Sequence, residues 1–405
     1  MAGLALVFVA VMFGTTLPTP LYPLYEHRLG FGEQTTTLVF ATYAVGQIVA
    51  ALGFGSLSDR RGRRPMLAAA IGLSSVSAVV YLLPAALGWL YLGRLLSGLS
   101  AGAVTAAASP MLVELLPARR TLATVLAATL NIGGLGLGVL ASGVLAQYAP
   151  HPLRVPFAID LVLVALAAIT LITVPETVQR RHADGHRAEQ NRTEQRRSGD
   201  GAWQPHAAGA FLRASLAGFA GFAVLSLFTA VAPAFMTDVL HDPNRAVTGV
   251  VACSAFAGSL LGQLISVFLA PERGLTLSCA GLILGMSLVA AALTGSSLAL
   301  LLTGAIIAGG GQGVGLRAGL ATVAAVAPEH RRAETTSYYF VVLYVGSALP
   351  VIGVGIASMH VSLVDSGVSF SAAIAAIAVA VVALLVRSHP QPTPARAGIS
   401  VRSHP

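Results

Sequence analysis

Hydrophobic residues along the chain come in long runs, separated by short segments rich in arginine, proline or other polar residues. A run of about 17–25 apolar residues has the length of a helix that crosses the hydrocarbon core of a bilayer. We therefore predict an all-α polytopic membrane protein. Its twelve transmembrane helices are expected near residues 3–25, 36–57, 66–86, 89–115, 122–147, 155–175, 210–236, 247–269, 275–294, 298–326, 335–358 and 367–386.

The first hydrophobic run is longer than the roughly 7–15 residues of the apolar region in a secretory signal peptide. We therefore interpret it as a first membrane span that is retained. Three prolines lie near its end, and each removes a main-chain donor, so we expect this helix to bend or break at Pro18, Pro20 and Pro23.

The composition agrees with a membrane protein. Of the 405 residues, 55% are hydrophobic and only 10% are charged, whereas soluble domains carry roughly 25% charged residues. A net charge of +8 would suggest nucleic acid as the partner of a soluble protein, but here the charge lies in short loops, so we expect none. The only cysteines, Cys253 and Cys279, lie in apolar runs and predict neither disulfides nor a metal site. No cofactor is expected.

The arginines gather in alternate loops, which predicts the orientation of the chain because basic loops are retained in the cytoplasm. The opposite loops hold only Arg28, Arg154 and Arg245. We predict an integral multi-pass protein of a bacterial plasma (inner) membrane with both termini in the cytoplasm. The cytoplasmic connections then hold Arg60, Arg61, Arg63, Arg64, Arg119, Arg120, Arg180, Arg181, Arg187, Arg192, Arg196, Arg197, Arg273, Arg331 and Arg332.

The chain divides into two similar halves. We predict a six-helix bundle over residues 1–175, a polar, flexible cytoplasmic linker over 176–209, a second six-helix bundle over 210–387 and a disordered tail over 388–405. When Pro117 is placed over Pro328, the fourth span of each half shows the same ladder of glycines, which predicts a duplicated, pseudo-symmetric structure. In this superposition Gly93, Gly98, Gly102 and Arg120 fall on Gly304, Gly309, Gly313 and Arg331.

A distinctive motif lies between the second and third spans, with a Gly, a Leu, an Asp-Arg pair and then Gly-Arg-Arg. It resembles the signature loop of the major facilitator superfamily, which implies a latch that opens and closes between two halves. A loop that only sets the topology would explain the arginines but neither Gly55 nor Asp59. We expect Gly55 to allow close helix packing and Gly62 a tight turn, and Glu114 to pair with the arginines. The resemblance assigns gating to Gly55, Asp59, Arg60, Gly62, Arg63 and Arg64.

The fourth span carries an intramembrane arginine, Arg94, followed four residues later by a glycine, and this resembles a second motif of the family. An arginine inside a span normally faces the bundle and has a partner, although here it lies near enough to the outer boundary to reach water. The resemblance implies proton coupling for Arg94. Glu26 and Asp160 lie at about the same predicted depth as Arg94, so we expect one of them to be its carboxylate partner. The glycines of the fifth span match the antiporter motif of the family only in part and equally suit plain helix packing.

Arg317 is the least expected charge, because it lies about 16 Å from the cytoplasmic end of the tenth span at 1.5 Å per residue. At that predicted mid-membrane depth it would bind an anionic substrate, neutralise a carboxylate or form a buried ion pair. Other polar residues inside the spans would line a cavity or join helices by hydrogen bonds. These substrate-binding candidates are Tyr43, Gln47, Asn131, Gln312 and Tyr344.

Together these features predict a secondary active transporter that moves a small organic molecule by alternating access. We expect proton-coupled efflux, that is, antiport, by a monomer in contact with membrane lipid, its substrate and protons. The alternative is proton-coupled uptake of an organic anion or metabolite, which Arg317 would favour. The spans contain no metal-ligand spacing, nucleophile motif or phosphate-binding loop, so we do not expect an enzyme.

Overall fold

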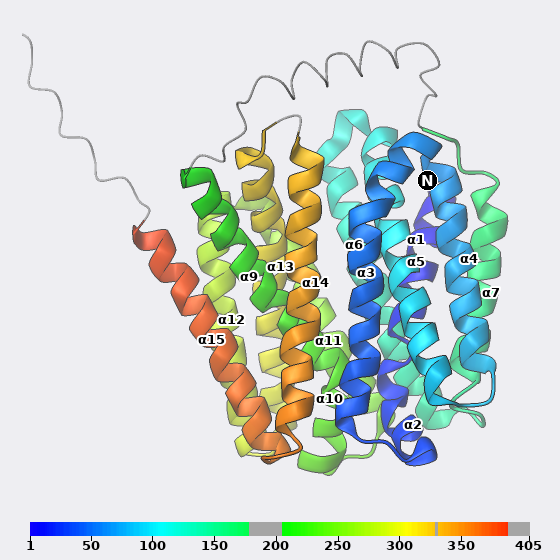
Figure 1. The fold of residues 1–405 in the computed structure, drawn as a ribbon, viewed down its shortest axis with the longest axis vertical. Coiled ribbons are helices and arrows are strands. Elements are labelled where there is room, and N and C mark those ends of the chain that lie inside the picture. Colours follow the sequence, from blue (N-terminus) through cyan, green and yellow to red (C-terminus); the bar gives the residue numbers. More distant parts are fainter. Residues whose placement is uncertain (178–204, 329–330, 388–405) are drawn as a thin grey trace, which may run out of the picture.

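The computed structural model describes residues 1–177, 205–328 and 331–387, and every regular element within these ranges is a helix (Figure 1). The predicted linker, apart from its two ends, and the predicted tail lie outside the described residues. Within the described ranges, eleven helices are long and apolar enough to cross a membrane, and the shorter apolar helix Val155–Leu171 occupies the place of the sixth predicted span. The prediction of an all-helical, twelve-span architecture is confirmed.

The two halves lie side by side, with the first half on the right of Figure 1 and the second on the left. The long helices of the first half are α1 (Ala2–Thr16), α2 (Tyr22–Leu29), α3 (Glu33–Arg61), α4 (Arg63–Leu82), α5 (Leu87–Leu115), α6 (Arg120–Tyr148) and α7 (Val155–Leu171). The second half contains α9 (Pro205–Ala230), α10 (Ala232–Ala234), the π-helix η3 (Phe235–Val239), α11 (Arg245–Ile265), α12 (Pro271–Thr294), α13 (Leu298–Val326), α14 (Arg332–Ala357) and α15 (Leu363–Arg387).

The bundle has two ends that differ in charge. We call the upper end of Figure 1, which holds the N-terminus and the turn between α3 and α4, the basic end. The opposite end, which holds the turns between α2 and α3 and between α14 and α15, is the far end. The arginine-rich turn at Arg60–Arg64 therefore lies at the same end as the N-terminus, as the sequence predicts.

The first span is broken where its prolines lie. Helix α1 ends at Thr16, a short 3-10 turn covers Thr19–Leu21, and α2 begins at Tyr22. The carbonyls of the last turn of a helix have no helical donors, so the break leaves acceptors for other side chains. Two of them are used by neighbouring helices: Ser142 Oγ donates to the carbonyl of Leu17 at 2.5 Å, and Arg94 donates to that of Thr15.

The glycine ladder confirms the internal repeat. In α5, Gly93 approaches α4 at Tyr81, whereas Gly98 and Gly102 approach α3. In α13, Gly304 likewise approaches α12, whereas Gly309 and Gly313 approach α11. A glycine lets two helix backbones come together because it has no Cβ. The matched glycines therefore make matched contacts in the two halves.

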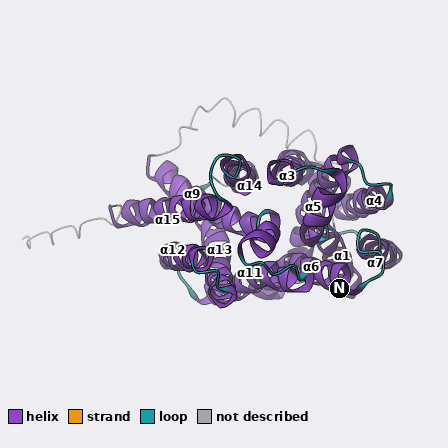
Figure 2. Cartoon of the chain, turned by 90° about the horizontal axis from the view of Figure 1, so that it is seen from below, coloured by secondary structure: helices purple, strands orange, loops and turns teal. Residues whose placement is uncertain are grey.

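The halves meet mainly along two helix pairs, α3 with α14 and α6 with α11 (Figure 2). The closest approaches of these pairs lie toward the far end. Gly143 of α6 abuts Gly249 of α11, and a Cβ on Gly355 of α14 would collide with the side chain of Thr37 of α3. Small residues at these points allow the two bundles to touch at the far end.

Candidate functional site

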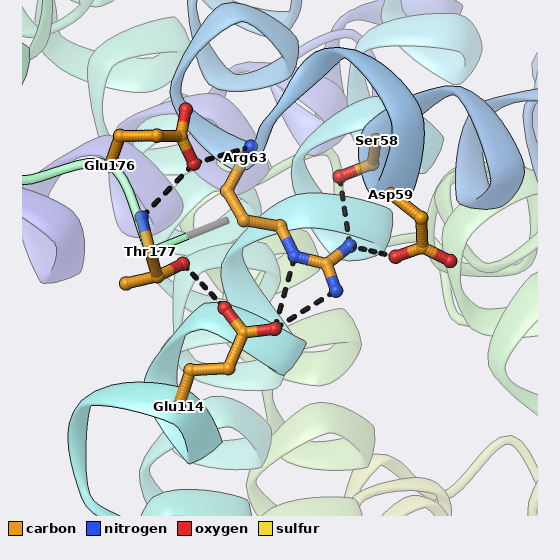
Figure 3. Close-up of polar contacts among 6 residues, drawn as sticks. All are labelled: Ser58, Asp59, Arg63, Glu114, Glu176 and Thr177. Atoms are coloured by element: carbon orange, nitrogen blue, oxygen red, sulfur yellow. Dashed lines mark hydrogen bonds and ion pairs between the residues drawn. The ribbon is translucent and has the colours of Figure 1, made fainter. Parts of the chain in front are cut away.

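Arg63 is the centre of a polar cluster at the basic end of the first half (Figure 3). It is the first residue of α4, and its side chain is only 10% exposed. Its guanidinium forms ion pairs with Asp59 at 2.6 Å and with Glu114 of α5 at 3.0 Å, and it donates to Ser58 Oγ at 3.0 Å. The cluster ties the ends of α3, α4 and α5 together.

Glu176 completes this cluster from the other side. Its two carboxylate oxygens accept the main-chain N–H groups of Arg63 and Arg64, each at 3.0 Å. A carboxylate at this place is favourable because the first N–H groups of a helix lack partners and carry positive potential. The hydroxyl of Thr177 donates to Glu114, so the chain after α7 is joined to the same network.

Gly62 is required by this arrangement. Its φ is 108° and its ψ is 157°, a conformation that residues with a Cβ rarely adopt. A Cβ at this position would also collide with the carboxylate of Glu176. The tight turn predicted at Gly62 is confirmed, with a second cause that the sequence does not show.

The structure brings together most of the predicted gating residues but not all. Asp59, Gly62, Arg63, Arg64 and Glu114 contribute to the cluster, whereas the exposed side chain of Arg60 makes no hydrogen bond or ion pair within the described ranges. The close packing predicted at Gly55 is wrong, because no atom lies within 4 Å of where its Cβ would be. The close approach of α3 to α5 occurs instead at Gly46, against the backbone of Leu95 and Gly98.

The sequence did not indicate Glu176 and Thr177 as members of the cluster, because both fall at the start of the predicted linker. The signal that would have identified Glu176 is its position. It is an acidic residue directly after the sixth span, at the end of the bundle that holds the arginine turn. The predicted boundary between bundle and linker at residue 176 therefore falls inside the cluster.

Arg94 is buried in the first half, with 1% of its surface exposed. Its Nη1 donates to the carbonyl of Thr15 at 2.7 Å, beside the break in the first span. Its guanidinium carbon lies 5.2 Å from the ring centre of Tyr22, 5.7 Å from that of Phe40 and 5.9 Å from that of Tyr43. Three aromatic faces and one carbonyl thus surround the charge.

Neither predicted carboxylate forms an ion pair with Arg94 in this conformation. Within the part of the chain that the structure describes, Arg94 has no acidic partner, and its Nε and Nη2 make no hydrogen bond. Glu26 accepts a hydrogen bond from the hydroxyl of Thr36 and lines a small pocket at the far end that also includes Glu33. Its coupling role therefore stays a prediction.

Asp160 lies on the other side of α1. The residue belongs to α7, is 2% exposed, and its Oδ1 has no hydrogen-bond partner. A Cβ built on Gly14 would lie 2.6 Å from Oδ2 and 2.8 Å from Oδ1, so the carboxylate rests on the bare backbone of α1. The next residue of α1 is Thr15, whose carbonyl accepts from Arg94. One segment of backbone, Gly14–Thr15, is thus in contact with both groups.

Aromatic side chains extend from Arg94 to the contact between the halves. In the first half, the ring centres of Phe40 and Tyr43 on α3 are 6.1 Å apart. In the second half, the ring of Tyr344 on α14 lies 5.9 Å from that of Phe340 and 5.9 Å from that of Phe222 on α9. Tyr43 and Tyr344 belong to α3 and α14, which pack against each other across the interface. We call these five residues the aromatic belt.

Two of the remaining predicted polar residues, Asn131 and Gln312, join helices within one half. Asn131 of α6 donates to Thr105 Oγ1 of α5 at 3.4 Å. Gln312 of α13 accepts from Ser259 Oγ of α11 at 2.5 Å, and its Nε2 has no partner. Gln47 lies on α3, one turn from Tyr43, and is half-buried. These contacts match the alternative of interhelix hydrogen bonding.

Arg317 does not lie at the depth that the sequence predicts. The next residue, Ala318, packs against Gly274, the fourth residue of α12, at the basic end of the bundle. Counting from the end of α13 places Arg317 too deep, because α13 extends past the point where α12 begins. The predicted mid-membrane depth is therefore wrong.

Arg317 also faces away from the interior of the second half. On α13, Gln312 packs against α9 and Gly319 against Tyr339 of α14, which defines the inner face. Successive residues of an α-helix are rotated by about 100° around its axis. Arg317 therefore points more than a third of a turn away from the direction of Gln312 and Gly319. It shares a stripe with the exposed Ile306. Among the described residues it has no hydrogen-bond or ion-pair partner.

Comparison with known proteins places this architecture in a family. The chain matches the model of the Major Facilitator Superfamily over residues 4–351. It is 34% identical over 116 residues to the tetracycline resistance protein, class B, of Escherichia coli. The aligned region covers 28% of each protein. It is 26% identical over 110 residues to the quinolone resistance protein NorA of Staphylococcus aureus, covering 27% of this chain and 28% of NorA. These matches span little more than a quarter of either relative.

Solved structures agree at the level of the fold. A D-xylose–proton symporter has a TM-score of 0.77 at 17% identity, over 96% of this chain and 97% of the symporter. An inward-facing bacterial homologue of the human lysosomal transporter Spinster has a TM-score of 0.66 at 15% identity, over 97% of this chain and 98% of the homologue. The resemblance seen in the signature loop is confirmed, and the chain belongs to the major facilitator superfamily, whose members are transporters and not enzymes.

Proposed function

We propose that this transporter exports a small apolar compound, neutral or cationic, in exchange for protons. It would work in the bacterial inner membrane with the basic end in the cytoplasm. The observation that carries the proposal is the contact of one backbone segment, Gly14–Thr15, with both Asp160 and Arg94. Proton exchange needs an acid that gains and loses a proton as the helices move. In this pair Asp160 is the acid, and Arg94 is a positive charge that would interact with its anionic form.

Asp160 fits the role of the proton carrier. A buried carboxylate without a charged partner or a full set of hydrogen bonds is unfavourable as an anion, whereas the neutral acid tolerates such a place. In the present conformation Asp160 therefore holds a proton. If α1 moves so that Asp160 meets Arg94 or water, the anion becomes favourable and the proton leaves. Movement of α1 and release of the proton would then be one event.

Arg94 fits the role of the group that responds. Only one of its nitrogens has a hydrogen-bond partner, and the rest of the guanidinium is held by aromatic faces. Such contacts stabilise a cation by about 0.5–2 kcal/mol each, which is less than a carboxylate at hydrogen-bond distance provides. An anionic Asp160 would therefore compete for Arg94 with the Thr15 carbonyl.

The aromatic belt favours an apolar or cationic substrate. Aromatic rings offer large flat apolar surfaces and attract cations through their faces. The belt lies where α3 and α14 meet, and alternating access would separate these helices. Two relatives are named for resistance to tetracycline and to quinolones, and these two drug classes are the first substrates to test.

Uptake of an organic anion, the other possibility that the sequence left open, has lost its main support. That possibility depended on Arg317 as an anion site in the membrane interior. The residue lies instead on the outer face of α13, level with the start of α12. The likeness to a D-xylose–proton symporter concerns the fold and carries no direction of transport.

The experiment is transport by the purified full chain in proteoliposomes with an imposed pH gradient and radiolabelled tetracycline or a fluoroquinolone. Antiport predicts that substrate accumulates in the acidic compartment as protons leave it, and that accumulation stops when a protonophore collapses the gradient. Accumulation in the alkaline compartment would mean symport and would contradict the proposal. Arg273→Ala, a change at an exposed arginine outside the predicted gating motif, serves as the control for protein quality.

A further inference from the structure

We propose that Arg317 binds the phosphate group of a membrane phospholipid on the outer surface of the second half, at the basic end. The residue is half-buried and has no hydrogen-bond or ion-pair partner in the described part of the chain. An arginine in a span normally has a partner, because a charge surrounded by hydrocarbon is costly. A partner outside the protein would meet that need.

The neighbouring helix shows where along the membrane normal Arg317 lies. Ile306 of α13 rests against Gly258 of α11, and Gly310 rests against Gly262 in the same register. Helix α11 ends at Ile265 and is followed by a 3-10 turn over Ser266–Phe268 that also contacts α13. If this pairing of α13 with α11 is extended along α13 to Arg317, the partner position falls beyond the end of α11. The segment beside Arg317 is therefore the loop that joins α11 to α12. Because α11 and α12 have the length and hydropathy of membrane spans, a loop at this level would lie where phospholipid headgroups begin.

The surface around Arg317 is apolar, as a lipid-facing surface must be. On α13, Ile306 is 43% exposed, and on the adjoining α11 and its following turn Ile265 is 54% and Phe268 is 88% exposed. Acyl chains would cover these side chains, and the phosphate at the top of the same lipid molecule would then lie at the level of Arg317. A guanidinium suits that ligand, because its planar fork donates two parallel hydrogen bonds to phosphate oxygens.

Other occupants fit the position less well. Glu272, the acidic residue of α12, is exposed and forms no ion pair with Arg317. A transported anion would have to reach the inner face of α13, where Gln312 and Gly319 lie, and Arg317 points elsewhere. Free inorganic phosphate would satisfy the guanidinium but would leave Ile265 and Phe268 uncovered.

The test is native mass spectrometry of the full chain released from detergent, titrated with phosphatidylglycerol. We expect wild type to retain one molecule more firmly than the rest. Arg317→Ala and the length-matched Arg317→Met should bind this lipid about tenfold more weakly, the effect of losing a charge-assisted hydrogen bond of moderate strength. Arg273→Ala, which removes the same charge from the exposed start of α12, is the control and should change binding less than twofold.

Three results would overturn the proposal. Equal affinity in wild type and both Arg317 variants would remove the residue from lipid binding. An equal loss in Arg273→Ala would mean a general attraction of charge. Displacement of the lipid by millimolar inorganic phosphate would mean a site for the free anion. A competition experiment on the wild-type protein gives a further test. Diacylglycerol has the acyl chains but no phosphate, so it should not displace bound phosphatidylglycerol, and displacement would contradict the proposal.

Discussion

The carboxylate of Asp160 lies directly against Gly14, one residue before the carbonyl of Thr15 that accepts a hydrogen bond from Arg94 at 2.7 Å. Asp160 comes from α7 and Arg94 from α5, so the two groups reach the first span from different helices. The contact lies at the last turn of α1, just before the break at Pro18. A shift of this turn moves both contacts together, which makes it the natural place for coupling.

Asp160→Asn should abolish proton-driven accumulation of substrate while leaving the folded protein intact. The amide is close to the shape of the neutral acid and cannot release a proton, so the present conformation is preserved. We expect the midpoint of thermal unfolding to stay within a few degrees of wild type. Asp365→Asn, at an exposed carboxylate at the far end, is the matched control and should transport normally. Full transport by the Asp160 variant would exclude the residue as proton carrier.

Gly14→Ala should damage both stability and transport, because its methyl group would overlap the Asp160 carboxylate. Overpacking of this kind costs about 1–3 kcal/mol. The double variant Gly14→Ala with Asp160→Ser should recover stability, since the smaller side chain makes room. The coupling free energy from such a double-mutant cycle, measured by denaturation in detergent, is expected to be clearly favourable. Additive effects would show that the two residues do not touch in solution.

Gly62→Ala should destabilise the basic end by about 1–3 kcal/mol, the range for a residue forced into a backbone region that suits only glycine. The added methyl group would also push Glu176 away from the N-terminus of α4. Thermal unfolding of purified protein measures the loss. Glu176→Ala alone should have a smaller effect, because it removes the helix cap but introduces no strain. If both variants unfold at the wild-type temperature, the turn does not stabilise the protein.

A cysteine pair at Thr37 and Gly355 should form a disulfide that holds the far end closed. A Cβ on Gly355 would lie 3.0 Å from Cβ of Thr37, so a small relaxation reaches the 3.5–4.5 Å of a disulfide. Transport in proteoliposomes should stop on oxidation and return on reduction, in a background with Cys253 and Cys279 replaced by alanine. Undiminished transport by the oxidised protein would mean that the far end does not have to open.

Much of the fold could be predicted because hydrophobic run length is a strong signal in lipid. The twelve helices, the break at Pro18–Pro23 and the repeated glycine ladder are all present. The turn at Gly62 was also predictable, because a glycine between arginines at a helix junction is typical of a chain reversal that a residue with a Cβ cannot make. What these features share is that their cause is local in the sequence.

The remaining features depend on contacts between distant segments. Glu176 caps α4 from beyond α7, and nothing in its own neighbourhood announces a partner more than a hundred positions away. The sequence predicts the wrong depth for Arg317 because a helix can extend past its neighbours, which the contact between Ala318 and Gly274 shows only in the structure. The close packing predicted at Gly55 is wrong for the same reason, because the sequence shows a glycine but not which residues lie opposite it.

The central claim, that Asp160 holds a proton which is exchanged for substrate, is tested most directly without any gradient. The ligand is the compound that raises the unfolding temperature of the protein most in a screen that begins with tetracycline and a fluoroquinolone. This ligand is mixed with purified protein in weakly buffered detergent solution, and the pH is followed with an indicator dye. Wild type should release about one proton per bound ligand, and Asp160→Asn, which still binds, should release none. Equal proton release by the two proteins would contradict the account.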